Sequence, residues 1–217
     1  MPGERINKAK SLSFAAILTY LGMACIAAAV VLVGLTFYPV FKVELSYWLY
    51  PPKTNIAVSL AQGANASAMV PKFPELGIVI PKIGANAKII TNVDPYDSRV
   101  YQEALTKGVA HAKGSVLPGS DGNSFLFSHS SANFYEATRY NSVFYLLTKL
   151  DIGDKIYVFV NNQKFTYTVT SKKIVDPKDV DFLSPKATGK QLTLMTCWPA
   201  GTSFKRYIIL AQVQPDK

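Results

Sequence analysis

The chain has 217 residues, of which 49% are hydrophobic and 17% charged, so it is too apolar for a disordered protein and must bury a core. Its formal net charge of +9 raises the question of an anionic partner. The basic residues are dispersed, with Lys172-Lys173 and Lys205-Arg206 as the densest groupings, and no nucleic-acid-binding motif is present. We therefore expect no nucleic acid partner, and we favour an anionic cell envelope or lipid headgroups.

The first element expected along the chain is a transmembrane helix in residues 11–41, which contain no charged side chain. A bilayer core requires about 20 apolar residues, so this segment is long enough to cross it. Arg5, Lys8 and Lys10 precede the segment, and an aromatic cluster follows it. The positive-inside rule then places a basic N-terminus (residues 1–10) in the cytoplasm and the rest of the chain outside, as a single-pass membrane protein.

A cleavable signal peptide is the alternative, but its apolar region has 7–15 residues, which is shorter than this segment. An uncleaved signal anchor is therefore preferred. Cys25 follows Gly22-Met23-Ala24, which fits a lipoprotein cleavage site poorly, so it is interpreted as a small apolar residue in lipid. Residues 42–75 are expected to form an extracytoplasmic linker, because residues 51–74 have the proline-rich and small-residue composition of a tether.

Residues 76–217 are expected to form a folded domain outside the membrane. A short helix at 101–106, capped by Asp97 or Ser98 and ended by Gly108, and helical spacing at 143–150 interrupt a series of apolar runs. The runs typical of strands are 76–80, 87–91, 124–128, 155–160, 165–170, 191–197 and 206–213, with a hairpin at Asn161-Asn162. Seven or eight strands with only short helices predict an all-β domain, either a closed barrel or a sandwich.

The number and positions of the cysteines make Cys197 a candidate reactive thiol. Because Cys25 lies in the membrane segment, Cys197 is the only thiol of the exported domain and cannot form an intradomain disulfide. A buried structural thiol is the alternative interpretation. However, Cys197 ends an apolar strand where a loop begins, Arg206 opens the next strand, and His129 follows the apolar run 124–128. A cysteine nucleophile requires a proton acceptor and a donor for the developing anion, and these three residues can supply all of this.

The sequence around Cys197 also resembles a known family. Thr193-Leu194-Met195-Thr196-Cys197, followed nine residues later by Arg206, is similar to the sortase signature TLxTC…R. The stretch from Gly108-Val109-Ala110-His111 to Phe125-Leu126-Phe127-Ser128-His129 resembles the segment that leads to the sortase histidine, and Ile80-Pro81-Lys82-Ile83 resembles the opening strand. The resemblance extends from about residue 76 to residue 213.

This resemblance implies a cysteine transpeptidase anchored in the bacterial cell membrane. Residues 76–217 are then its catalytic domain, a closed eight-stranded β-barrel with short helices, preceded by the transmembrane helix. It makes Cys197 the nucleophile, His129 the general acid and base, and Arg206 the donor to the oxyanion or substrate. Thr196 and Ser128 are supporting residues; Thr196 is expected near the oxyanion, and Ser128 stands where many sortases have glycine. His111 is the competing imidazole and is expected to be structural.

The implied reaction is cleavage of a Leu-Pro-x-Thr-Gly-like (LPxTG-like) sorting motif at the C-terminus of surface proteins, followed by transfer of the acyl group to an amine of the cell envelope. Membrane lipid is a further partner, and no cofactor or metal is expected. The segment 174–190 is expected to carry specificity, because loops between barrel strands vary and bind ligands. The single N-terminal anchor favours a cell-wall-anchoring sortase over the pilus type. An exported cysteine hydrolase and a non-catalytic wall-binding β-domain are the alternatives.

Overall fold

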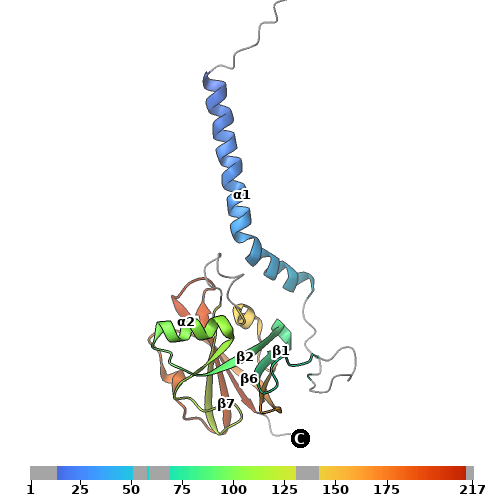
Figure 1. Ribbon diagram of the computed structural model, residues 1–217, viewed down its shortest axis with the longest axis vertical. Helices are drawn as coiled ribbons and strands as arrows, with labels where there is room; N and C mark the ends of the chain where they lie inside the picture. The colour runs from blue at the N-terminus through green and yellow to red at the C-terminus, as the bar shows by residue number, and fades with distance from the viewer. Residues whose placement is uncertain (1–13, 51–57, 59–68, 131–141, 214–217) are drawn as a thin grey trace, which may run out of the picture.

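The computed structural model describes residues 14–50, 58, 69–130 and 142–213 (Figure 1). The expected basic N-terminus and most of the expected linker lie outside these described residues. The described chain forms one long N-terminal helix and a β-barrel that carries short helices.

The N-terminal helix α1 (Phe14–Leu49) has 36 residues, which correspond to about 54 Å. Its first part, Phe14–Thr36, is long and apolar enough to cross a membrane by length and composition, and none of its apolar window is buried against the barrel. The helix continues past the expected apolar segment to Leu49, and its second half bends over one end of the barrel (Figure 1). Pro39 lies in this half, and proline bends helices because its nitrogen cannot donate a hydrogen bond.

The barrel confirms the expected all-β domain and decides between the two architectures. Eight strands close in the order β1-β2-β3-β4-β7-β8-β6-β5, so the domain is a barrel rather than a sandwich. The pairs β2–β3 and β4–β7 are parallel, and all other neighbours are antiparallel. The strands are β1 (Leu76–Ile80), β2 (Ala85–Val93), β3 (Val109–Ala112), β4 (Gly122–Phe127), β5 (Lys155–Val160), β6 (Gln163–Val175), β7 (Lys190–Trp198) and β8 (Lys205–Val213).

The directions of the strands define two ends of the barrel. Strands β1, β4, β6 and β7 finish at one end, where β2, β3, β5 and β8 begin. The short 3-10 helix η2 (Tyr145–Lys149) leads into β5 at this end, and its flanking residues Phe144 and Leu150, with Leu147, are fully buried in the main core. We call this the η2 end of the barrel. The main core otherwise consists of the inward-facing, alternate residues of the strands.

A smaller core lies outside the barrel wall, beneath helix α2 (Ser98–Lys107). The expected cap is confirmed: the Asp97 carboxylate accepts hydrogen bonds from the backbone N–H groups of Arg99 and Val100. Ala104 and Leu105 of α2 pack on Phe125 and Phe127 of β4. This packing fixes α2 along the outer face of the sheet.

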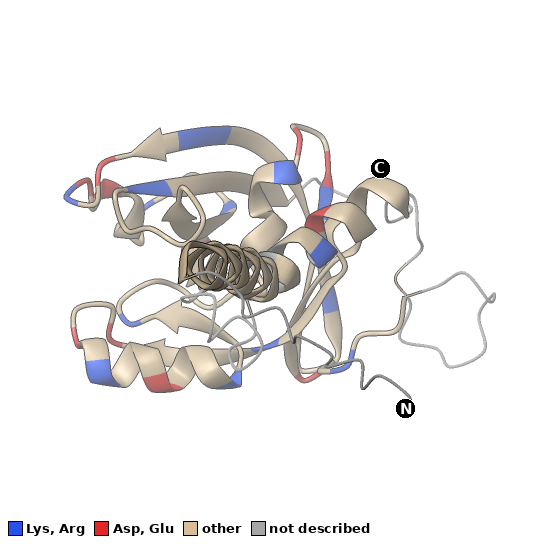
Figure 2. Cartoon of the chain, turned by 90° about the horizontal axis from the view of Figure 1, so that it is seen from above, with Lys and Arg blue, Asp and Glu red and all other residues tan. Residues whose placement is uncertain are grey.

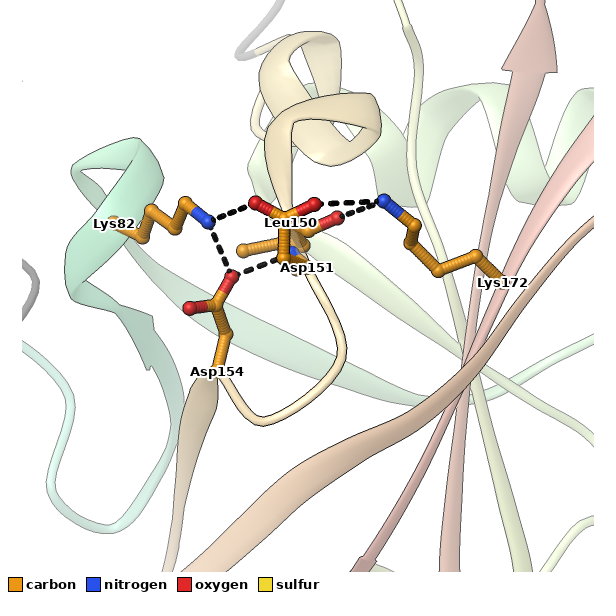
Figure 3. Close-up of polar contacts among 5 residues, drawn as sticks. All are labelled: Lys82, Leu150, Asp151, Asp154 and Lys172. Carbon is orange, nitrogen blue, oxygen red and sulfur yellow. Dashed lines mark hydrogen bonds and ion pairs between the residues drawn. The ribbon is translucent and has the colours of Figure 1, made fainter.

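An ion network fastens the η2 end (Figure 3). The Lys82 Nζ lies 2.7 Å from one carboxylate oxygen of Asp151 and 2.7 Å from one of Asp154. On the other side, the Lys172 Nζ lies 2.9 Å from Asp151 and donates a hydrogen bond to the Leu150 carbonyl at 2.8 Å. Lys82 follows β1 in the 3-10 helix η1 (Pro81–Ile83), and Lys172 lies on β6. The network therefore joins both strands to the turn before β5.

The view down α1 shows where charge lies in the described residues (Figure 2). The membrane-length part of the helix carries no charged residue, whereas positive and negative residues are interspersed over the barrel. The excess of positive charge is thus spread over the barrel and is not gathered on one face.

Candidate functional site

Cys197 and Arg206 lie opposite each other at the η2 end of the barrel. They are directly paired in the antiparallel ladder between β7 and β8, so their side chains project from the same face of the sheet. The Cys197 side chain is partly exposed, and among the described residues both cysteines are free thiols. The thiol is therefore accessible and not locked in the core.

His129 reaches the same level from the other side of β7. Strands β4 and β7 run parallel with Phe127 beside Met195, and the Ser128 N–H continues the pairing by donating to the Met195 carbonyl at 3.2 Å. Two residues beyond this pair, His129 comes level with Cys197. Because side chains alternate along a strand, His129 also faces outward, as Phe127 does. The structure thus brings the three candidate residues into one row across β4, β7 and β8.

The row lies in a groove of about 740 Å³ on the outer face of the sheet. The floor is apolar, with Phe125, Phe127 and Met195, and α2 forms one wall. The opposite wall has two parts. One is the segment between β6 and β7, which includes the 3-10 helix η3 (Asp181–Leu183), and the other is the loop between β7 and β8. Both Cys197 and Tyr96 line the groove.

The Arg206 guanidinium is oriented by backbone carbonyls. Its Nη1 donates to the carbonyls of Ser203 and Lys205, both at 3.1 Å. A guanidinium has five N–H donors in a rigid plane, so these two bonds leave further donors for a ligand beside Cys197. Such a fixed cation stabilises negative charge that develops next to the sulfur.

The two supporting residues hold the strands that carry the row. The Thr196 hydroxyl donates to the Ser128 carbonyl at 2.9 Å, and both residues are buried. This bond ties the end of β4 to β7. The Ser128 hydroxyl itself is buried without a hydrogen-bond partner in the part of the chain that the structure describes.

Comparison with known proteins identifies the family. A family model for the sortase domain matches residues 78–214. The chain is 31% identical over 156 residues to Sortase D of Bacillus subtilis, which covers 70% of each chain. It is 25% identical over 174 residues to Sortase A of Streptococcus agalactiae, covering 80% of this chain and 65% of the other. The crystal structure of sortase C-1 from Actinomyces oris superimposes with a TM-score of 0.55 at 31% identity, covering 66% of this chain and 75% of that one.

The chain belongs to the sortase family. Sortases are membrane-anchored cysteine transpeptidases that attach surface proteins, and the apolar α1 of this sortase fits that anchoring. Proteins named sortase A, C and D all match, so the family is shown while the choice between a wall-anchoring and a pilus-building type is not made by these matches.

The second histidine of this sortase is separate from the groove. His111 lies on β3, where the neighbours Ala110 and Ala112 pack beneath α2, so the imidazole points into the barrel. It is 4% exposed, and its Nε2 contacts the Val116 carbonyl at 2.9 Å. Burial lowers the pKa of His111, although the bond to the Val116 carbonyl acts in the opposite direction. His111 is placed to hold the loop after β3.

Asn123 is a positioning residue to which our sequence analysis gave no role. It is buried at the start of β4, and its amide nitrogen donates to the carbonyls of Phe182 and Ser184 at 2.8 and 3.0 Å. Its amide oxygen accepts from the Thr193 hydroxyl at 2.7 Å and from Gln191 at 3.2 Å. One side chain therefore fastens the groove wall at η3 to two strands of the floor. The only signal in the sequence is an amide just after a turn-rich stretch.

No group of three or more His, Cys, Asp or Glu residues is arranged to hold a metal ion among the residues described here.

Proposed function

We propose that this sortase cleaves an LPxTG-like sorting motif through a thioacyl intermediate on Cys197 and transfers the acyl group to an amine of the cell envelope. The observation that carries the proposal is the row of Cys197 on β7, Arg206 on β8 and His129 just after β4, in a groove on the outer face of the sheet. The motif, the acceptor and the roles of these residues are our proposals.

In the first half of the reaction, the Cys197 sulfur attacks the carbonyl carbon of the bond after the motif threonine. The carbonyl oxygen becomes negative, and Arg206 donates hydrogen bonds to it. His129 protonates the leaving amine as the carbon–nitrogen bond breaks, which leaves a thioester on Cys197.

In the second half, an envelope amine attacks the thioester carbon. His129 accepts the proton of that amine, the carbon–sulfur bond breaks, and the Cys197 thiolate is released. The product is a new amide, and His129 and Cys197 return to their starting states. The Thr196–Ser128 bond supports both steps because it fixes the spacing of the strands that carry the nucleophile and the base.

The lining of the groove supports a peptide substrate with an apolar side chain. Its floor lies beside β4 and includes Phe125 and Phe127, and His129 lines it just beyond the end of that strand. The apolar floor favours a leucine-type side chain over a charged one, and Asp179 is the one acidic residue that lines the groove.

For the membrane, we propose a single-pass anchor with the N-terminus in the cytoplasm and the barrel outside, and a wall-anchoring role. The support is α1, whose first part is long enough to span a bilayer, and the basic residues that precede it. A substrate on the outer surface and an amine of the envelope are then both within reach of the barrel.

The test is acyl transfer by the full chain in detergent. An LPxTG peptide is supplied with and without hydroxylamine or a peptide with an N-terminal glycine. We expect faster cleavage with the amine and a product that carries it, because a transpeptidase positions the amine and not water at the thioester. A free-acid product at a rate that ignores the amine would show a cysteine hydrolase instead.

Two alanine variants complete this test. Cys197→Ala should remove turnover while the barrel stays folded, and the matched control Cys25→Ala should retain it, because Cys25 is in the apolar helix α1. Full turnover by Cys197→Ala would refute the assigned nucleophile. A folded wild-type chain with no reactive thiol and no turnover would favour the non-catalytic binding domain.

A further inference from the structure

The proposed catalytic residues and the membrane helix meet at the same end of the barrel. His129 and Cys197 lie where β4 and β7 finish, and Arg206 lies where β8 begins. The helix η2 closes this same end, as its buried neighbours in the core show. A contact between α1 and η2 therefore sets the position of the catalytic end relative to the membrane.

Such a contact is present in the second half of α1. Glu44 accepts a hydrogen bond from the Tyr145 hydroxyl at 3.3 Å, and its other oxygen lies 3.2 Å from the Lys149 Nζ. The Lys149 Nζ also lies 5.6 Å from the ring centre of Tyr47, one turn further along α1. Burial raises the pKa of Tyr145 to about 12, and the Glu44 carboxylate adds to this shift, so the phenol remains a donor at physiological pH. Glu44 and Tyr47 of α1 thus contact Tyr145 and Lys149 of η2.

The chain between α1 and the barrel is also held to the barrel wall. Val58 is 4% exposed and packs on Val79 and Phe159, outside β1 and β5. Further on, the Asn86 side chain donates to the Val70 carbonyl at 2.9 Å and accepts from the Lys72 N–H at 3.0 Å. These described points are attachments, and they oppose free rotation of the barrel about α1.

The η2 end also presents apolar side chains to its surroundings. Ile152 lies in the turn before β5 and is 68% exposed, and Phe204 lies in the loop before β8 and is 74% exposed. Trp48 and Tyr50, at the end of α1, are 77% and 79% exposed. Large apolar and aromatic side chains of this kind are favoured at the interface between lipid and water.

The distance along α1 brings this end to the bilayer surface. Glu44 is eight residues beyond Thr36, where the apolar span ends, which corresponds to about 12 Å along the helix. The bend in α1 reduces the height above the membrane further (Figure 1). The headgroup layer is about 5–8 Å thick on each side, so η2 lies next to it.

We propose that the second half of α1 docks on η2 through Glu44 and holds the catalytic end of the barrel against the outer surface of the bilayer, with Phe204 and Ile152 in contact with lipid. The partner is the membrane itself, and the proposal rests on the membrane anchoring proposed above. The groove then opens at the level where a membrane-bound substrate emerges from the bilayer.

The test measures the contact with lipid at each end of the barrel, using the full chain in phosphatidylcholine–phosphatidylglycerol vesicles. A fluorophore is attached through Phe204→Cys or Ile152→Cys at the η2 end, or through Asn162→Cys at the opposite end, in a Cys25→Ala/Cys197→Ala background. Vesicles that carry a nitroxide on the lipid headgroup quench fluorophores close to the surface. We expect strong quenching at positions 204 and 152 and little at position 162.

Charge reversal then tests the docking contact. Glu44→Lys removes the ion pair with Lys149 and adds repulsion, which should lower the ratio of barrels docked on α1 to undocked barrels by about tenfold. If most barrels are docked in the wild type, about half remain docked in the variant, so the quenching at positions 204 and 152 should fall by about twofold. Adding Lys149→Glu should restore the quenching. The matched control is Glu103→Lys, which disrupts the exposed pair with Lys107 on α2 and should change nothing. Tyr145→Phe, which removes only the hydroxyl, should have a smaller effect in the same direction as Glu44→Lys.

The outcomes separate this proposal from the proposed function. Equal quenching at the two ends, or quenching that Glu44→Lys leaves unchanged, would overturn the orientation. A chain that does not float with vesicles would overturn the anchoring on which it rests. Neither readout depends on turnover, so an inactive chain can still confirm the orientation.

Discussion

Replacement of Lys82 by methionine tests how the η2 end is held together. Lys82 is the one cation that contacts both Asp151 and Asp154 in the described structure, each at 2.7 Å. Its side chain is 16% exposed, and that of Asp154 is 18% exposed. Methionine keeps the length and the apolar stem of the side chain but removes the charge. Of the contacts in the described structure, the Asp154 carboxylate would then keep its bond from the Asp151 N–H.

The expected loss of stability in Lys82→Met follows from how deeply Lys82 and Asp154 are buried. An exposed ion pair contributes about 0–1 kcal/mol, and breaking a fully buried pair costs about 3–5 kcal/mol. The pair between Lys82 and Asp154 lies between these limits, so we expect Lys82→Met to cost about 2 kcal/mol of the free energy of unfolding. For a chain of this size, that lowers the Tm by about 4–8 °C. Glu103→Gln, which breaks the exposed pair with Lys107, is the control and should cost less than about 0.5 kcal/mol.

The same network predicts a dependence on pH. Hydrogen bonds from Lys82 and Lys172 lower the pKa of Asp151 from its ordinary 3.8 to about 2. A carboxyl group whose pKa is lower in the folded state stabilises the fold above pH 4, and this contribution is lost between pH 4 and pH 2. Although burial by itself lowers the pKa of Lys82, its bonds to Asp151 and Asp154 raise it overall, so its contribution persists to alkaline pH and is lost above about pH 10.5.

Thermal unfolding of the full chain in detergent measures both effects. Trp198, at the end of β7, reports on the barrel by fluorescence in a Trp48→Phe background. The difference in Tm between wild type and Lys82→Met should be constant near neutral pH and should shrink as the pH falls from 4 to 2. A loss no larger than that of Glu103→Gln, or a difference that is unchanged at pH 2, would refute the account of the network.

Four further substitutions test the groove and the separate role of His111. Arg206→Lys should lower the rate at least about 10²-fold, the effect of losing one oxyanion donor, because an ammonium cannot offer parallel donors; a rate close to wild type would reduce Arg206 to a structural role. His129→Ala should be nearly inactive, whereas His111→Ala should mainly lower the Tm; equal loss of activity in two folded variants would contradict the separation of the histidines. Asn123→Ala should raise the KM for the peptide more than it lowers kcat, since it frees the wall at η3 but leaves the row around Cys197 in place. An unchanged KM would show that the wall does not need this anchor.

Helices and strands could be predicted from the sequence where neighbouring residues alone determine them. The strand at residues 76–80 has the expected bounds, and the Asp97 cap marks the start of α2. In contrast, β6 runs to Val175 although we expected it to end at residue 170. Its last residues include the charged pair Lys172-Lys173, and they form a strand because β8 pairs with them. The four-residue strand β3 was not predicted, because Val109–Ala112 is too short to show alternation and depends on its partners β2 and β4.

The candidate site was predictable to a similar extent. A hairpin between β7 and β8 follows from the short loop in the sequence, so Cys197 and Arg206 could be paired in advance. The position of His129 next to them depends on the parallel pairing of β4 with β7, which are more than sixty residues apart in the chain. No local pattern encodes a pairing over this distance. The position of His129 after the apolar run 124–128 made it a candidate, the sortase resemblance implied its role, and the topology gives the physical reason why it lies beside Cys197.

The candidate residues lie on or next to strands, whereas the groove walls are formed by connecting segments, and this difference affects how the domain can diversify. Cys197 and Arg206 belong to the hydrogen-bonded sheet, where strand spacing of about 4.8 Å fixes their separation, and His129 follows the end of β4, which pairs with β7. One groove wall is α2, which packs on the sheet through side chains. The other is the segment between β6 and β7, which is joined to the start of β4 by the N–H groups of Gly122 and Asn123 and by the Asn123 side chain. Insertions, deletions and substitutions in these walls therefore reshape the groove without changing the spacing of the row. Recognition can evolve quickly on this scaffold while the chemistry stays constant.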